Sequence, residues 1–306
     1  LPVANAYTLT LTGTSAAMGD LNALNAKTSV EINVDTVTGL TGTSAELSAL
    51  LSGATTLALV SADTTRGFAV TANGGFDGDE TITLNGTVSA ADADTASGAT
   101  TGIVTATIDA GSAAVINGLL GAIGGADLLT ITLTDATVAA TDLSGLNGKT
   151  AVDVNAASVG TVTGTVTELQ AAYVSGVLGL GNEAITVTDA SISVANANIV
   201  AGLTTGVVTA TITEGDMATL AGLTETGHAY TVNVTDTANV SASALTTLDG
   251  KTTVAVDASL VTSVTGSQAE LLALYEAGAA GRITGLGNEA ATINVTVSAA
   301  EANQVS

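Results

Sequence analysis

Short segments that alternate apolar and polar residues recur along the whole chain and are rich in β-branched side chains. Residues 229–236, for example, read AYTVNVTD. Alternation with a period of two predicts a β-strand with one buried face. Eleven such segments are predicted as strands: 7–13, 30–35, 81–85, 103–109, 129–135, 151–155, 185–189, 207–213, 229–236, 253–257 and 292–297.

Three short helices are predicted between these strands. Each begins with a hydroxyl residue that is followed three positions later by Glu, the pattern of a capping box. The pairs are Thr43 with Glu46, Thr165 with Glu168, and Ser267 with Glu270. An apolar run follows each pair, and a glycine marks the expected end of each helix: Gly53, Gly176 and Gly278.

The chain also repeats whole phrases. LNAKT at residue 24 returns as LNGKT at 146 and LDGKT at 248, and GLGNEA occurs at both 179 and 285. These repeats predict three copies, 7–127 with an insertion near 53–80, 128–228, and a truncated copy 229–306, which together form one continuous solenoid.

Strands joined by short crossovers favour parallel pairing. The predicted fold class is therefore an α/β solenoid of stacked parallel β-strands with short helical or irregular crossovers. The alternative is a row of tandem immunoglobulin-like β-sandwiches. The capping boxes argue against that alternative, because a sandwich has little room for a helix in its connections.

Composition narrows the possible partners. The net charge is -23, with 5 Lys and Arg against 28 Asp and Glu, so binding to nucleic acid is not expected. Cys is absent, which excludes disulfides and thiol chemistry. No stretch has the roughly 18 consecutive apolar residues that a membrane span needs, so membrane insertion is not expected either.

The insertion near 53–80 holds the candidate binding residues. Its end reads NGGFDGDE, in which Asp77, Asp79 and Glu80 are candidate calcium ligands. The alternative is a polar hairpin without a metal, and no other cofactor is expected. Both phenylalanines of the chain, Phe68 and Phe76, lie in this insertion, and we expect them to form an assembly or contact surface.

Other residues recur at fixed places, which indicates structural roles. Lys27, Lys149 and Lys251 occupy the same position in the three copies of the LNGKT phrase. A lysine after a helix or turn offsets the partial negative charge of exposed carbonyl groups. Aspartates close many strands, and Asx turns are expected there; a carboxylate ladder that binds cations or another subunit is the alternative. These aspartates are Asp35, Asp109, Asp135, Asp189, Asp236 and Asp257.

No catalytic signature accompanies these patterns. The lone histidine, His228, precedes a predicted strand and is expected in a turn. A metal site or a Ser-His-Asp triad would need partners and a pocket, which a regular ladder rarely provides. The sequence therefore predicts a protein that is not an enzyme.

Three phrases, VNVTDT at 232–237, LDGKTTVAVDA at 248–258 and GVVTATI at 206–212, resemble the repeats of very large secreted cyanobacterial surface proteins of the β-strand-repeat class. The resemblance implies an extracellular or cell-surface role in adhesion, motility or filament formation, and it implies no catalytic residue. The tandem calcium motif that such proteins often carry is not evident in this chain.

Two functions are expected. The first is a structural extracellular protein that self-associates into a homopolymeric filament, fibre or surface layer, because the ends of a solenoid expose unpaired strand edges. The second is an adhesin-type binding module that recognises glycans or another cell surface through the insertion near 53–80. Deletion of the insertion separates the two, because only the adhesin loses its binding while filaments stay intact.

Overall fold

The computed structural model describes residues 6–7, 9–28, 32–34, 36–52, 79–173 and 176–294. The chain divides into two compact units. Unit 1 comprises Leu1–Asp135, Asp142–Ser158 and Val174–Gly179, and unit 2 comprises Ala136–Thr141, Val159–Tyr173 and Leu180–Ser306. The boundaries predicted from the repeated phrases at 127 and 228 are a separate division and stay a prediction.

Unit 1 contains three parallel sheets. The largest has the order β2 (Ser15–Ala17), β4 (Gly39–Gly42), β5 (Thr81–Val88), β6 (Val104–Ile108) and β7 (Leu128–Thr130). The two smaller sheets pair β1 (Leu9–Thr10) with β3 (Ile32–Asn33) and β9 (Val154–Asn155) with β11 (Val177–Leu178). The helices are α1 (Met18–Asn25), α2 (Ser44–Ser52), α3 (Ala90–Ala99) and α4 (Ala113–Leu119), and α5 (Ala140–Asn147) begins in unit 2.

Unit 2 repeats this plan. Its largest sheet has the order β8 (Thr137–Ala139), β10 (Thr161–Gly164), β12 (Ala184–Val187), β13 (Val208–Thr211) and β14 (Ala229–Thr231). A second sheet contains β15 (Val240–Ser241), β17 (Ser263–Gly266) and β19 (Ala290–Ile293), and a third pairs β16 (Val256–Asp257) with β18 (Ile283–Thr284). The helices are α6 (Val166–Ala172), α7 (Val194–Ala201), α8 (Met217–Leu220), α9 (Ala242–Asp249) and α10 (Gln268–Ala279).

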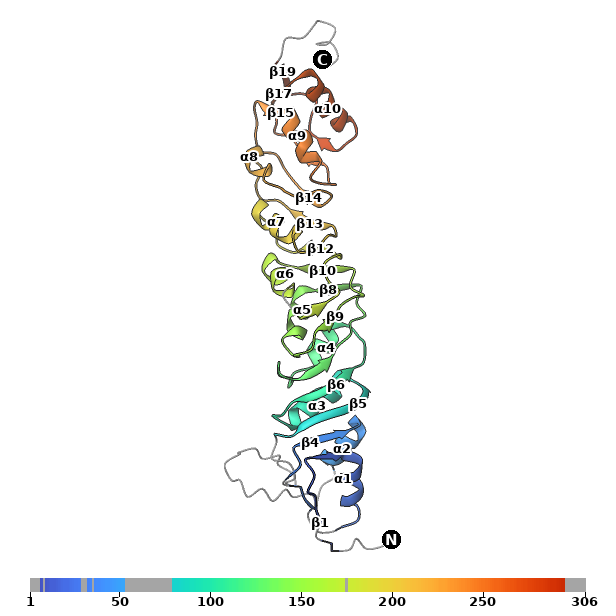
Figure 1. The fold of residues 1–306 in the computed structure, drawn as a ribbon. Helices are drawn as coiled ribbons and strands as arrows, with labels where there is room; N and C mark the ends of the chain where they lie inside the picture. The colour runs from blue at the N-terminus through green and yellow to red at the C-terminus, as the bar shows by residue number, and fades with distance from the viewer. Residues whose placement is uncertain are drawn as a thin grey trace. The chain divides into compact units, whose positions relative to one another are not determined.

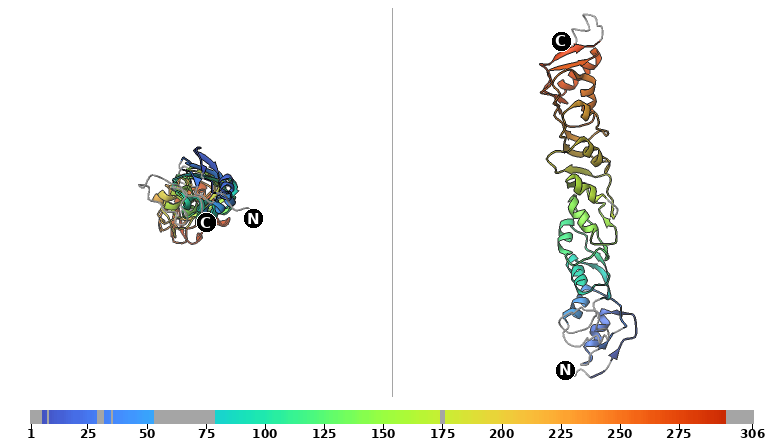
Figure 2. Two further views of the ribbon diagram at one scale, coloured as in Figure 1. Left: turned by 90° about the horizontal axis from the view of Figure 1, so that it is seen from below. Right: turned by 90° about the vertical axis from the view of Figure 1, so that its left-hand side faces the viewer.

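Strands and helices alternate within each unit (Figure 1), and two further views show the same alternation (Figure 2). Throughout the described residues, all thirteen strand pairs are parallel. The α/β character predicted from the sequence is therefore confirmed. The immunoglobulin-like alternative is wrong, because such sandwiches are built from antiparallel strands.

Register places like residues above one another. In the largest sheet of unit 2, Val138 pairs with Val162, Val162 with Ile185, and Ile185 with Val208. All four side chains are buried, so β-branched residues form a continuous column along the sheet. We call the residues from one strand to the next strand that pairs with it a strand repeat.

The helices cover the strands with small aliphatic side chains. In α7 the buried residues are Val194, Ala197, Val200 and Ala201, and in α10 they are Leu271, Leu274 and Ala277. Spacings of three and four residues place these side chains on one face of each helix. None of the helices in the described ranges is both long and apolar enough to cross a membrane.

All three predicted capping boxes are present. The hydroxyls of Thr165 and Ser267 accept from the third amide of α6 and α10, and Glu168 and Glu270 return the bond. At α2, the Thr43 hydroxyl accepts from the N–H of Glu46 (3.2 Å) and a Glu46 carboxylate oxygen accepts from the N–H of Thr43 (2.8 Å).

Most strands are shorter than predicted, although β5, Thr81–Val88, is longer than the predicted 81–85. The predicted strand 229–236 reduces to β14, Ala229–Thr231, with an isolated bridge between Asn233 and Asp257. A second set of strands that lies directly before helices was missed, including β10 and β17. Their sequences, TVTG and SVTG, are too short for alternation to identify them.

Candidate functional site

Buried threonines connect each strand repeat to the one before it. The Thr252 hydroxyl donates to the carbonyl oxygen of Tyr230 (2.7 Å), 22 residues earlier. It also accepts from the backbone N–H of Tyr230 (3.0 Å) and of Val254 (3.1 Å). Four further buried threonines donate to a carbonyl of an earlier strand repeat: Thr28, Thr100, Thr150 and Thr204. The last residue of the repeated LNGKT phrase is therefore explained by a backbone contact rather than by a ligand.

Carboxylates from one strand repeat cap helices of the previous one. Asp135 accepts from the N–H of Ala113 at the start of α4 (2.6 Å), and Asp236 accepts from the N–H of Met217 at the start of α8 (2.7 Å). Asp189 and Glu214 make the same contact to α6 and α7. A carboxylate is favourable at this end of a helix because the first amides have no partner within the helix.

The Asx turns expected at the strand ends are present at only some positions. Asp257 accepts from the N–H of Ser259 (2.9 Å), and this bond lowers the pKa of its carboxyl. At Asp135, Asp189 and Asp236 the recorded bond runs instead to a helix of the preceding strand repeat. The difference arises because the neighbouring helix start brings an unpaired amide within reach of the side chain.

Two of the three repeated lysines donate to carbonyl groups across strand repeats. Lys149 Nζ donates to the carbonyl oxygen of Leu120, which follows α4, and Lys251 Nζ donates to that of Thr224 (2.8 Å). Lys27 is exposed, and no partner is recorded for it in the described part of the chain. Lys149 and Lys251 thus lie beside backbone carbonyls, as expected for a structural role.

The GLGNE phrase forms a tight loop around a carboxylate. Gly179 and Gly181 have φ angles of 89° and 120°, which favour glycine. The Glu183 carboxylate accepts from the N–H of Gly181 (2.7 Å) and of Asn182 (3.0 Å), and from the hydroxyl of Tyr173. Burial, together with this bond to Glu183, raises the pKa of Tyr173 above its ordinary value.

The second copy of this loop borders a pocket. Gly285 and Gly287 have φ angles of 84° and 128°, and Glu289 accepts from the N–H of Gly287 (2.6 Å) and of Asn288 (3.0 Å). Burial would raise the pKa of Glu289, but these bonds lower it overall. Burial and Glu289 raise the pKa of Tyr275 to about 12.

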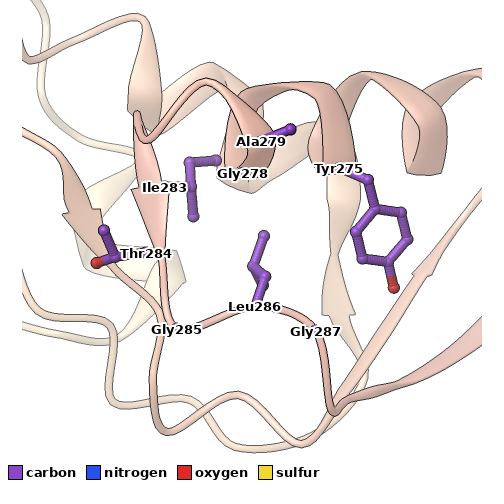
Figure 3. A pocket seen from close by; sticks show the side chains of 8 residues that line it. All are labelled: Tyr275, Gly278, Ala279, Ile283, Thr284, Gly285, Leu286 and Gly287. Carbon is purple, nitrogen blue, oxygen red and sulfur yellow. The ribbon is translucent and has the colours of Figure 1, made fainter.

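The pocket has a volume of about 430 Å³ and lies between α10 and the loop (Figure 3). Ile283 and Leu286 project into it, and Tyr275 stands at one side. Its lining is mostly backbone and aliphatic side chains: Tyr275, Gly278, Ala279, Ile283, Thr284, Gly285, Leu286 and Gly287. This pocket contains no pair of titratable groups that could act as acid and base.

His228 is part of the backbone network rather than a reactive group. Its Nδ1 accepts from the N–H of Val208 (3.1 Å), and its ring lies 5.2 Å from that of Tyr230. Burial lowers its pKa, against a smaller opposing effect of Glu225. The side chain is therefore neutral, and its Nδ1 serves as a buried acceptor for the N–H of Val208.

The calcium and contact predictions fall mainly on residues that lie outside the described ranges, namely Asp77, Phe68, Phe76 and the stretch 53–78. Of the remaining ligand candidates, Asp79 is exposed and Glu80 is buried. Within the described ranges, no group of three or more His, Cys, Asp or Glu side chains could hold a metal ion. The calcium site and the adhesin surface at the insertion stay predictions.

No protein-family model, no curated protein and no solved structure matches this chain significantly. The functional interpretation therefore depends on the geometry. That geometry brings carboxylates, hydroxyls and ammonium groups to backbone partners in neighbouring strand repeats.

Proposed function

We propose that the chain is a structural repeat protein of an extracellular or cell-surface assembly. In this proposal the strand repeats form one solenoid, and solenoids join through their terminal strands into a filament, fibre or surface layer. The chain is then not an enzyme, needs no cofactor, and has a second copy of itself as its principal partner.

The parallel register between consecutive strand repeats carries this proposal. Each repeat depends on its neighbour for hydrogen bonds, as at Thr252 with Tyr230 and at Asp236 with Met217. A terminal repeat has such a neighbour on one side only. Its strand edge is therefore a template on which another chain can continue the sheet.

The strongly acidic composition is consistent with this role. Many carboxylates serve backbone amides inside the fold, as those of Glu183 and Asp189 do. The remaining negative charge supports solubility of the free chain, and the resemblance to secreted surface repeats supports an extracellular location.

Edge strand β19 offers a direct test. The N–H groups of Ala290 and Asn294 donate to the carbonyl oxygens of Thr262, just before β17, and Gly266, at its end. By the alternation of a parallel strand, the N–H of Ala291 therefore points to the opposite edge. Ala291→Pro removes that outward donor and leaves the pairing with β17 intact. Thr292→Val, on the same strand, leaves the outward N–H of Ala291 in place and serves as the matched control.

We expect sedimentation velocity and negative-stain microscopy to show assembly that grows with protein concentration. Ala291→Pro should stop growth at one end and shorten or abolish the assemblies, whereas Thr292→Val should assemble normally. A chelator should have no effect on assembly through this edge. Monomers at every concentration would contradict the proposal.

A further inference from the structure

The backbone at two glutamates of this chain is contacted by a Thr-Thr-Gly segment from the next strand repeat. In unit 2, residues 204–206 lie against Glu183 at the end of the GLGNE loop. In unit 1, residues 100–102 lie against Glu80. The same recognition thus occurs twice, at places far apart in the sequence.

The contacts of the covered loops define what is recognised. In unit 2, the Thr204 hydroxyl donates to the carbonyl oxygen of Glu183 (2.6 Å), and the N–H of Thr205 donates to that of Gly181 (2.8 Å). In unit 1, the Thr100 hydroxyl donates to the carbonyl oxygen of Glu80 (2.6 Å). The first threonine therefore recognises the carbonyl of the glutamate in both cases.

Glycine at the third position is required by space. A Cβ on Gly206 would overlap the carbonyl oxygen of Glu183, and a Cβ on Gly102 would overlap that of Glu80. The overlap is with backbone, which cannot move aside as a side chain end can. Only a segment that carries glycine at this place can approach the loop.

The strand that follows completes the contact. The N–H of Ile185 donates to the carbonyl oxygen of Val207 (2.9 Å), and the N–H of Ile82 donates to that of Ile103 (3.0 Å). Strand β12 then pairs with β13, and β5 pairs with β6. The recognised element is therefore an extended strand that begins with Thr-Thr-Gly.

The loop at 285–289 has the same shape as the loop at 179–183, and within the described residues no Thr-Thr-Gly segment covers it. Its glycine φ angles of 84° and 128° match the 89° and 120° of the covered copy, and Glu289 accepts the same pair of backbone amides as Glu183. Yet Glu183 and Ile185 are buried, whereas their counterparts Glu289 and Ala291 are half-buried and exposed, respectively. In the described part of the chain, β19 pairs with β17 alone.

We propose that the segment Gly285–Ile293 is an acceptor for an extended strand of another polypeptide that begins with Thr-Thr-Gly and continues with alternating β-branched residues. The two such segments of this chain, at 100–102 and 204–206, are engaged internally and define the sequence that the partner strand should carry. The partner's first threonine donates to the Glu289 carbonyl, its glycine lies against that carbonyl, and its next residue accepts from the Ala291 N–H. This inference deepens the proposed assembly and rests on it.

A labelled peptide with the sequence of residues 203–213, LTTGVVTATIT, is the probe. Its binding to the full chain is measured by fluorescence anisotropy at a protein concentration low enough to keep the chain monomeric. We expect saturable binding. A peptide with Gly206→Ala should bind at least tenfold more weakly, and so should a peptide with Thr204→Val, which loses the hydroxyl donor.

Variants of the chain locate the site. Ala291→Pro should abolish peptide binding, whereas Thr292→Val should bind within about twofold of the unchanged chain. Circular dichroism of both variants verifies that they are folded. Hydrogen exchange of the unchanged chain gives a second measurement that needs no variant, because the bound peptide should slow exchange of the Ala291 amide.

The proposal is overturned if the unchanged peptide does not bind, if Gly206→Ala binds equally well, or if the Ala291 amide gains no protection. Filament formation is measured separately at high concentration, so a failure of peptide binding leaves the proposed assembly standing, and a failure of assembly leaves a positive binding result standing.

Discussion

Replacement of the buried Thr252 by valine tests whether threonine hydroxyls hold consecutive strand repeats together. Valine has nearly the same shape as threonine, so Thr252→Val removes the hydroxyl and leaves the packing in place. The three hydrogen bonds that the hydroxyl makes to Tyr230 and Val254 are lost together.

The expected loss follows from the groups left behind. The N–H of Tyr230 belongs to a fully buried residue, whereas Val254 is partly exposed and its N–H can bond to water instead. An unsatisfied buried backbone group costs about 1–3 kcal/mol. One fully buried and one partly solvated N–H therefore predict a fall of about 2–4 kcal/mol in the free energy of unfolding.

The assay is urea unfolding followed by circular dichroism, with hydrogen exchange of the Tyr230 amide as a local readout. Thr209→Val is the matched control, because Thr209 lies on an exposed position of β13. This control should change stability by less than about 0.5 kcal/mol. If Thr252→Val is as mild as the control and the Tyr230 amide stays protected, the hydroxyl does not connect the repeats and the reasoning fails.

Three further predictions concern other contacts between strand repeats. Gly206→Ala should lower the free energy of unfolding in urea by about 1–3 kcal/mol, because its Cβ overlaps the Glu183 carbonyl. The control Gly118→Ala, at an open helical position, should be neutral or slightly stabilising. Equal effects of the two substitutions would argue against the close approach at Gly206. Asp236→Ala should lower the free energy of unfolding by about 1 kcal/mol, because it removes the acceptor at the start of α8. Asp236→Asn should lower it less. An unchanged melting temperature for Asp236→Ala would show that the carboxylate does not cap the helix. The pKa values of His228 and of the carboxyls of Asp257 and Glu289 are lowered in the folded state, so the folded state binds fewer protons than the unfolded state. The melting temperature should therefore fall as the pH drops below the histidine's ordinary pKa of 6.5. It should fall more steeply below about pH 4, where the carboxyls are protonated. His228→Thr should remove the first part of that decline, and an unchanged pH profile would contradict the assignment.

The sequence predicted the α/β character because its signals are local. Alternation of β-branched residues identified one strand in most strand repeats, and the capping boxes at Thr43, Thr165 and Ser267 identified three helix starts. These patterns need only a few neighbouring residues, so no knowledge of the tertiary structure is required.

The missed elements lack such local signals. Helices α3, α7 and α9 are preceded by Ser89, Ser193 and Ser241, whose hydroxyls cap the helix without a glutamate three residues later. Strands β10 and β17 have four residues each. Both kinds of element gain their stability from packing against neighbouring repeats, which propensity does not reveal.

The role of the carboxylates could be predicted only in part. An aspartate at a strand end indicates an Asx turn, and Asp257 forms one. Asp135 and Asp236 instead reach helices 22 and 19 residues earlier in the chain. That choice depends on the three-dimensional offset between repeats, and the proposed acceptor at Gly285–Ile293 likewise emerges only when the loops at 179–183 and 285–289 are compared in space.

X-ray diffraction from concentrated, aligned protein tests the central claim most directly. If the strand repeats form one solenoid that continues from chain to chain, parallel strands stack along the filament axis, and the pattern should contain a meridional reflection near 4.8 Å, the spacing between paired strands. Isotropic scattering from dispersed particles, with no reflection along the axis, would contradict the account.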